Sequence, residues 1–197
     1  MSLKELLLKN RSYRRFYENE PIAAEALKEM VENVRYEASP SNLQPLQFVI
    51  VNHPEMNRKI FPLLKWAGFL KDWKGPEDGE RPAAYIIMLG NRQISTHVDW
   101  DYGIALQTIL LSAAEKGYGG CAIGSCDRDK IQQLLEIPKE LEIGCVIALG
   151  KPKEKVVLED VKGDDIKYWR DEDQVHHVPK RTLKELLIKV VSPPRKP

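Results

Sequence analysis

The sequence contains little cysteine and no long hydrophobic run. Its 197 residues include three cysteines, Cys121, Cys126 and Cys145, an odd number without paired spacing. We interpret them as small buried residues in a reducing compartment, because a disulfide framework needs pairs. The longest apolar run, Ala83 to Leu89, has seven residues, whereas a membrane-spanning helix needs about 20. We therefore expect a cytoplasmic protein without a membrane partner.

The sequence start does not predict a signal peptide, and there is no excess of charge of one sign. The apolar stretch Leu6 to Leu8 is too short for the core of a signal peptide, and Lys9 follows it directly. There are 30 Lys and Arg against 29 Asp and Glu, which gives a net charge of +1. Proteins that grip a nucleic-acid backbone are usually strongly basic. Nucleic acid is therefore not an expected partner.

Common catalytic and metal-binding motifs are missing. The sequence has no G-x-x-x-x-G-K-[ST] phosphate loop and no G-x-S-x-G nucleophile elbow. Its four histidines, His53, His97, His176 and His177, lack metal-ligand spacing with cysteines or carboxylates. We predict no metal site and no catalytic side chain of the hydrolase type.

The apolar pattern predicts helices and strands in one domain over 1–191, followed by a proline-rich arm over 192–197. Capping-box patterns begin at residues 2, 96 and 182. The strands are apolar without alternation, as strands covered on both faces are. Their separation by helices predicts an α/β layered fold and leaves open whether the sheet is wholly parallel. Helices are expected over 2–9, 23–36, 54–64, 98–116, 127–135 and 182–188, and strands over 47–52, 83–89 and 143–150.

Three arginines near the start of the chain could bind an anion. Arg11, Arg14 and Arg15 lie within five residues and surround Ser12. The arginine side chain binds phosphate through a planar fork of donors, and a serine hydroxyl adds a short hydrogen bond. A solvated basic surface at the end of the first helix is the alternative reading.

A second polar segment, Pro40 to Pro45, precedes the first strand and is a turn by composition. Asn42 and Gln44 carry amides that both donate and accept hydrogen bonds. Such groups suit the edge of a flat heterocycle, although plain turn chemistry explains them as well. A phosphate at one end and a hydrogen-bonding ring at the other describe a flavin mononucleotide.

Two further segments could extend such a site. Gly119 to Gly124 offers backbone without bulk, which permits close approach of a flat ligand. Lys180 and Arg181 precede the final predicted helix, where free backbone N–H groups favour an anion. A solvated charge pair is the alternative for these two residues.

Taken in this order, the segments resemble the FMN-dependent nitroreductase family over most of the chain. The resemblance is carried by Arg11–Phe16, the turn Pro40–Pro45, Asp101–Gln107, Gly119–Gly124, Ile147–Pro152 and His177–Arg181.

The resemblance implies an α+β three-layer sandwich with a mainly antiparallel central sheet flanked by helices. It also implies a homodimer built through the long central helix, with arms exchanged between subunits. Two FMN molecules would sit at the dimer interface, each touched by both chains.

Roles carried over from the family are assigned by position. The phosphate and ribityl end would be held by Arg11, Ser12 and Arg14 together with Lys180 and Arg181. The other subunit would supply Pro40, Ser41 and Asn42, while Gln44 would face the polar edge of the flavin. Ile123 and Gly124 would lie by the ring, near N5.

Two features depart from the family pattern. Ser41 and Asn42 are adjacent, whereas the family usually has one or two residues between them. The region 61–82 is short compared with members that carry a long substrate-covering insertion. Trp66 and Phe69, with Trp73, could line the substrate pocket or belong to the core.

The resemblance implies a flavoprotein oxidoreductase that works by a ping-pong scheme. NAD(P)H would pass a hydride to FMN, and a nitroaromatic, quinone or similar flat acceptor would then take it. A flavoprotein oxidase or dehalogenase of the same fold is one alternative. A non-catalytic FMN-binding module is another.

Overall fold

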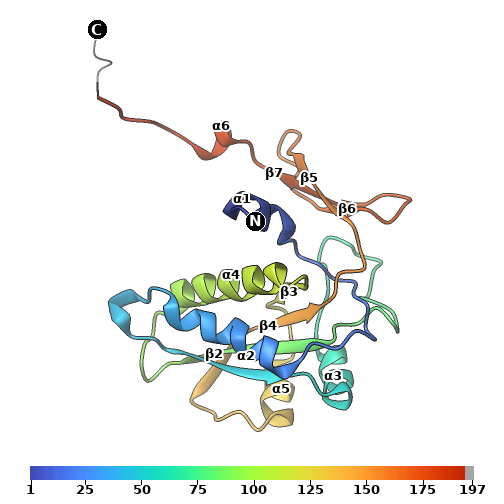
Figure 1. Cartoon of the computed structure of the whole chain (residues 1–197), viewed down its shortest axis with the longest axis vertical. Helices are drawn as coiled ribbons and strands as arrows, with labels where there is room; N and C mark the ends of the chain where they lie inside the picture. The colour runs from blue at the N-terminus through green and yellow to red at the C-terminus, as the bar shows by residue number, and fades with distance from the viewer. Residues whose placement is uncertain (194–197) are drawn as a thin grey trace. The chain divides into compact units, whose positions relative to one another are not determined.

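The computed structural model describes residues 1–193, which form two compact units, Met1–Glu154 and a second that begins at Lys155 (Figure 1). The sequence pattern predicted one domain over 1–191 and did not indicate a division after Glu154. Of the arm expected over 192–197, residues 194–197 lie outside the described residues. Within residues 1–193, no helix has the length and apolar character that crossing a bilayer requires.

The first unit is built on a four-stranded sheet in the order β1-β2-β4-β3. All neighbouring strands run antiparallel, which confirms the α+β fold implied by the family resemblance. The α/β reading of the spacing was wrong, because helices bury this antiparallel sheet on both faces, as they bury a parallel one. The strands are β1 (Leu46–Val51), β2 (Ala84–Asn91), β3 (Gly119–Ile123) and β4 (Leu141–Gly150).

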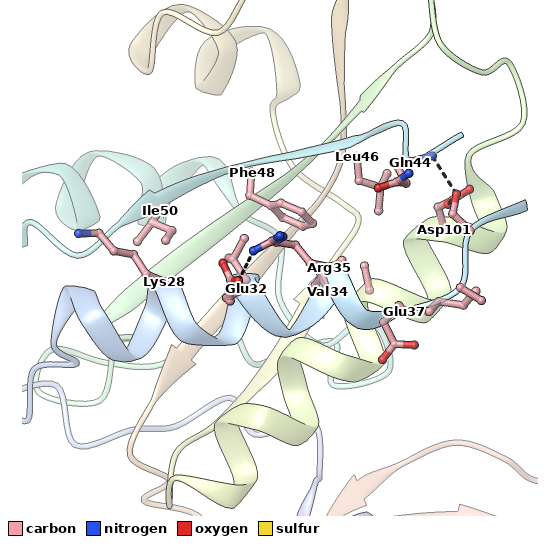
Figure 2. Close-up of a pocket in the computed structure, with 15 residues that line it drawn as sticks. Lys28, Glu32, Val34, Arg35, Glu37, Gln44, Leu46, Phe48, Ile50 and Asp101 are labelled. Atoms are coloured by element: carbon pink, nitrogen blue, oxygen red, sulfur yellow. Dashed lines mark hydrogen bonds and ion pairs between the residues drawn. The ribbon is translucent and has the colours of Figure 1, made fainter. Parts of the chain in front are cut away.

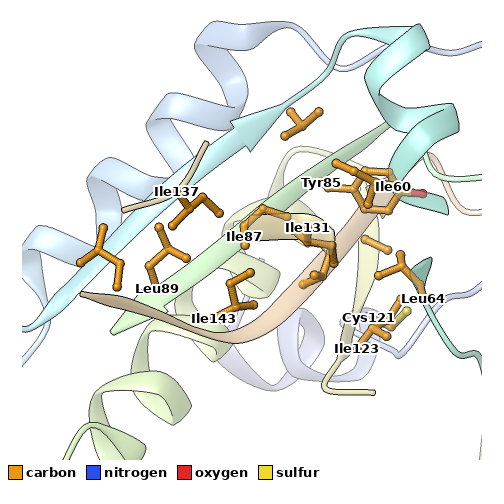
Figure 3. Close-up of a cluster of buried hydrophobic side chains, with 14 of the residues drawn as sticks. Ile60, Leu64, Tyr85, Ile87, Leu89, Cys121, Ile123, Ile131, Ile137 and Ile143 are labelled. Atoms are coloured by element: carbon orange, nitrogen blue, oxygen red, sulfur yellow. The ribbon is translucent and has the colours of Figure 1, made fainter. Parts of the chain in front are cut away.

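Side chains of the central strand β2 alternate between two apolar clusters, one on each face of the sheet. Ile86 and Met88 join the cluster formed with α2 (Ala24–Glu32) and α4 (Asp99–Glu115). Tyr85 and its alternate neighbours join the opposite cluster, which includes residues of α3 (Pro54–Ile60) and α5 (Arg128–Leu134) (Figure 3). The helices are therefore the outer layers of a three-layer sandwich.

Helix ends follow the capping chemistry in two of the three predicted cases. Ser2 and Glu5 form a capping box at α1 (Leu3–Lys9), and Thr182 and Glu185 form one at α6 (Leu183–Leu186). The box expected at Thr96 was wrong, because α4 begins three residues later, behind Val98. The Thr96 carbonyl instead accepts a hydrogen bond of 2.6 Å from Arg92.

Short 3₁₀ segments replace the ends of two predicted helices and shape one loop. The helix expected to reach residue 36 continues beyond α2 as η1 (Asn33–Tyr36), and α3 continues as η3 (Phe61–Leu63). A third segment, η2 (Pro40–Asn42), lies in the polar turn before β1.

The second unit holds a three-stranded sheet that the apolar pattern did not predict. Its strands are β5 (Val156–Asp160), β6 (Trp169–Arg170) and β7 (His176–Lys180), in the order β5-β7-β6. β5 and β7 are parallel, whereas β6 and β7 are antiparallel. These strands are short and partly exposed, so they give no continuous apolar run. α6 follows β7 and ends at Leu186, short of residue 188.

We expect Gly120→Ala to weaken the pairing of β3 with β4. A Cβ atom at Gly120 would lie 2.4 Å from the carbonyl oxygen of Ala148, and backbone cannot move aside as a side chain can. The free energy of unfolding in urea should fall by about 1–3 kcal/mol. Gly68→Ala is the control, because a Cβ there meets no described atom within 4 Å. Equal effects of the two substitutions would contradict this packing.

Candidate functional site

The arginine segment after α1 runs along the outer edge of β3. Ser12 forms a parallel bridge with Gly120, and the Tyr13 amide donates to the Gly120 carbonyl at 3.1 Å. Phe16 forms an antiparallel bridge with Pro152. The segment is thereby held beside the start of the strand, with Ser12 exposed.

The three arginines of this segment are held differently. Arg15 is committed to Glu80, to which its Nε and Nη2 atoms donate at 2.5 and 2.8 Å. This hydrogen bonding raises the pKa of Arg15 and lowers that of Glu80. Arg14 donates to the Ser12 carbonyl at 3.2 Å. Arg15 therefore serves the fold and is not part of an anion site.

Arg11 retains capacity for a ligand. Its Nη2 atom donates to the Leu7 carbonyl at 2.7 Å, while its buried Nε atom has no hydrogen-bond partner among the described residues. Burial lowers the pKa of Arg11, but a guanidinium stays protonated in proteins. A half-buried cation whose Nε donor lacks a partner among the described residues favours an anionic ligand.

The glycines of β3 do not all serve the role predicted for them. A Cβ atom at Gly119 would lie 2.4 Å from the Tyr13 ring, so packing alone requires glycine there. At Gly124, by contrast, a Cβ atom would meet no described atom within 4 Å. Gly124 is exposed, and Ile123 is buried in the core. The far end of this segment, at Gly124, is therefore open for a ligand.

The turn before β1 has an unusual backbone. Ser41, Asn42 and Gln44 have φ angles of 51°, 53° and 50°, a left-handed region that residues with a Cβ atom seldom adopt. The Gln44 side-chain amide donates to the carbonyl and the side chain of Asn42, both at 3.1 Å. The two predicted amides therefore lie together in one exposed structure.

The sheet keeps this turn far from the arginine segment of the same chain. Gly120 is in register with Leu149, which pairs with Ala84 of β2, whereas Leu46 pairs with Gly90. Six residues of strand and three strand spacings thus separate Leu46 from Gly120, roughly 25 Å in all. The end of β3 lies about 17 Å from Leu46 by the same reckoning. One chain does not bring the two predicted parts of the site together.

A groove of about 590 Å³ runs beside the turn, between α2, β1 and the first turns of α4 (Figure 2). Its floor on the edge strand is apolar and is formed by Leu46, Phe48 and Ile50. Gln44 and Asp101 lie at one end of it. The groove therefore has an apolar floor along the edge strand β1, while Lys28, Glu32 and Arg35 line its opposite side.

The second unit carries Lys180 and Arg181 at the end of β7. Lys180 is the last residue of the strand, and Arg181 immediately precedes the N-cap Thr182. Arg181 lies 3.7 Å from Glu185 in an exposed pair. The predicted contact of these two residues with an anion stays a prediction.

A histidine between two carboxylates ties this strand to its neighbours. His177 of β7 binds Asp171 through Nε2 at 3.0 Å and Glu159 of β5 through Nδ1. The Trp169 ring stacks on the imidazole with centroids 4.1 Å apart. Hydrogen bonding, first to Asp171, raises the pKa of His177, and the same bond lowers the pKa of Asp171.

The aromatic residues proposed for substrate contact differ in exposure. Trp66 is 8% exposed and belongs to the core cluster, with its ring near those of Phe61 and Trp73. Phe69 is 49% exposed. Burial favours the core alternative for Trp66, whereas substrate contact by Phe69 stays a prediction.

Neither the buried cysteines nor the acidic residues among 1–193 form a thiolate or metal site. Burial raises the pKa of Cys121 to about 12 and that of Cys145 to about 11, so both stay thiols at neutral pH. Among residues 1–193, no group of three or more His, Cys, Asp or Glu side chains could hold a metal ion.

The model of the Nitroreductase family matches residues 7–151 of the chain. This chain belongs to the nitroreductase family. A protein of Archaeoglobus fulgidus, provisionally named an NADH dehydrogenase/NAD(P)H nitroreductase, is 25% identical over 149 residues, which cover 72% of this chain and 80% of that protein.

Solved structures of other members share the fold. A nitroreductase family protein of Streptococcus pneumoniae superposes with a TM-score of 0.66 at 17% identity, over 84% of this chain and 96% of that one. A protein of Exiguobacterium sibiricum, determined in complex with FMN, has a TM-score of 0.63 at 19% identity, over 78% and 90% of the two chains.

Sequence reasoning missed three residues of this family member. Glu80 withdraws Arg15 from the anion site, and Ser39 and Asp101 hold the turn before β1. Asp101 stands in the motif that carried the family resemblance, and Ser39 directly precedes the predicted turn. No local pattern pairs Ser39 with Asp101, because 62 residues separate them.

We expect the β5-β7-β6 sheet to weaken as the pH rises. The folded-state pKa of His177 lies above its ordinary 6.5. The stabilisation from the imidazolium is therefore complete below about 6.5 and is lost as the pH rises through the raised value. An NMR titration of the His177 ring, with hydrogen exchange of β7 amides, measures both effects. In His177→Gln, β7 exchange should be faster at low pH and lose this pH dependence.

His97→Gln is the matched control, because His97 is exposed in the loop before α4. It should leave β7 exchange unchanged at every pH. A His177 pKa at or below 6.5 would contradict the clamp between Asp171 and Glu159.

Proposed function

We propose that this nitroreductase binds FMN and uses it to pass a hydride from NAD(P)H to a flat acceptor, such as a nitroaromatic or a quinone. This proposal rests mainly on two features at opposite ends of β3. A half-buried arginine, whose Nε donor has no partner among the described residues, lies beside the start of the strand, and an exposed glycine with open space follows its end.

The phosphate end of FMN fits beside Gly120. Arg11 offers its Nε donor there, and Ser12 offers an exposed hydroxyl from the bridged segment. A charge-assisted hydrogen bond to an ionised phosphate is stronger than a neutral one. Arg14 would add positive charge to this end of the site, and the contact of Lys180 and Arg181 with the phosphate stays a prediction.

The ring end of FMN fits the far end of β3. Gly124 lies about 13 Å along the strand from Gly120, a separation that suits an elongated nucleotide better than a compact anion. Ala122 and Gly124 are exposed, while Cys121 and Ile123 face the core. The small exposed residues would let the ring approach the backbone.

A second copy of the chain would complete the site. The turn Pro40, Ser41, Asn42 and Gln44 would contact the flavin edge, but Leu46, where the turn enters β1, lies about 17 Å from the end of β3 of its own chain and roughly 25 Å from Gly120. A homodimer removes this conflict, because the turn of one chain can meet β3 of the other.

Exposed apolar residues after β7 also support a homodimer. Ile188 is 98% exposed and Val191 is 84% exposed, an unusual state for large aliphatic side chains. The apolar groove along β1 offers a surface of matching character. An arm exchanged between subunits would bury both.

The cofactor supplies the redox chemistry when bound, because a flavin accepts and donates a hydride. The protein holds the phosphate with fixed cations, aligns the ring along β3, and offers backbone and amide groups to the ring edge. Phe69 would lie against the flat acceptor. No acidic or basic side chain is assigned a proton-transfer role.

A flavin-dependent dehalogenase is the second candidate. An iodotyrosine deiodinase of Thermotoga neapolitana is 23% identical to this chain over 168 residues. The two reactions differ in substrate and can share the same cofactor contacts. A protein that binds FMN without turnover would be a third outcome.

Steady-state oxidation of NADH and NADPH tests the proposed activity. With menadione or nitrofurazone present, the FMN-loaded protein should oxidise at least one nicotinamide far faster than without an acceptor. Dehalogenation of an iodophenol without activity on these acceptors would favour the second candidate. A yellow protein with no turnover in either assay would favour the third outcome, a protein that binds FMN without catalysis.

We expect Arg11→Ala to lower the affinity for FMN. The substitution removes a charge-assisted phosphate contact worth about 1.5–3 kcal/mol, or roughly 10- to 100-fold in Kd. Fluorescence titration of the apoprotein with FMN measures the change. Arg58→Ala, at an exposed position of α3, is the control and should bind like the wild type. Equal affinity of both variants would remove Arg11 from the phosphate site.

A further inference from the structure

Three residues of the turn before β1 have unfavourable backbone conformations. Ser41, Asn42 and Gln44 all have positive φ angles, between 50° and 53°, and none of them is a glycine. Such conformations persist only where surrounding contacts hold them, and they gather at functional sites. The side chains of all three residues are exposed, so packing of these side chains does not hold the turn.

Ser39 holds both ends of this turn through one hydroxyl group. Its Oγ atom accepts a hydrogen bond from the Gln44 amide at 2.9 Å and donates one to Asp101 Oδ1 at 2.6 Å. Its carbonyl accepts a bond of 2.8 Å from the Asn42 amide. Ser39 therefore fixes the entry and the exit of the turn at the same point.

Asp101 anchors this point to the central helix. It lies in the first turn of α4 and is 6% exposed. A carboxylate in this position is stabilised by the free N–H groups at the helix start. The short bond from Ser39 is charge-assisted and hence stronger than a bond between neutral groups. The turn is thus attached to a buried element.

Beyond the turn, a second contact fixes the chain before it enters β1. The Asn91 amide donates to the carbonyl of Pro45 at 2.8 Å, and Pro45 is buried. The segment between Ser39 and Pro45 is therefore closed at both ends, and its exposed amides project from a fixed base.

We propose that Ser39 and Asp101 are positioning residues that preset the Pro40–Gln44 turn for contact with the flavin edge in a partner copy. The inference rests on the proposed function, since the flavin is its target. It goes further by assigning the preorganisation of the turn to a hydroxyl–carboxylate pair that acts through the Gln44 amide. Preorganisation of this kind raises affinity, because the cost of ordering the turn is met before binding.

Ser39→Ala tests the proposal with little risk to folding, because it removes one oxygen atom. Hydrogen exchange of the Gln44 amide should accelerate by about tenfold or more, because that amide loses its acceptor. The Kd for FMN should rise about tenfold, and the flavin absorption bands should shift as the ring edge loses fixed donors. Ser39→Thr keeps the hydroxyl and should restore all three readouts.

Two further variants sharpen the test. Asp101→Asn keeps an oxygen that accepts from Ser39, so it should give smaller changes than Ser39→Ala. Ser95→Ala is the matched control, because Ser95 makes a similar local bond, accepting from the His97 amide at 3.1 Å. It should leave the Gln44 amide and FMN binding unchanged.

The outcomes separate this inference from the proposed function. Failure of the wild type to bind FMN would overturn the proposed function and the role of the turn with it. Tight FMN binding by the wild type together with unchanged Kd and exchange in Ser39→Ala would overturn the positioning role alone. Faster exchange with unchanged FMN affinity would also overturn it, since the turn would then be held for the fold only.

Discussion

The antiparallel sheet fixes the distance on which the rest of the proposed site depends. β3 and β1 are its two edge strands, with β4 and β2 between them. The arginine segment joins the β3 edge through Ser12, and the amide-bearing turn enters the β1 edge at Leu46. Since strand spacing and rise hardly vary, no side-chain rearrangement brings these polar groups together in one chain. This separation is the reason why we propose that two copies of the chain form the site.

Local packing explains why the polar residues divide into functional and structural ones. Glu80 takes the Nε and Nη2 donors of Arg15, whereas Arg11 keeps a buried Nε donor without a partner among the described residues. Gly119 and Gly120 are required by close contact with Tyr13 and Ala148, whereas Gly124 faces open space. Residues of the same type, a few positions apart, therefore serve the fold in one case and are available to a ligand in the other.

Much of the first unit could be predicted from the sequence, because its helices and strands carry strong apolar patterns. Strand direction could not, since burial on both faces hides it, and the antiparallel arrangement came from the family resemblance alone. β3 was not predicted because its glycines leave no continuous apolar run, and β5 to β7 were not predicted because they are short and partly exposed. The pairing of Ser39 with Asp101 could not be predicted either, because it depends on how β1 and α4 pack in three dimensions.

The most direct measurement is complementation between two defective chains. Arg11→Ala and Ser39→Ala would be placed on separately tagged copies, and the mixed dimer would be purified and titrated with FMN. A site shared between copies predicts one intact site per mixed dimer, formed by Arg11 of one chain and the turn of the other, with wild-type affinity. Mixed dimers that bind FMN no better than the two parent variants would contradict the account, because each site would then be built from a single chain.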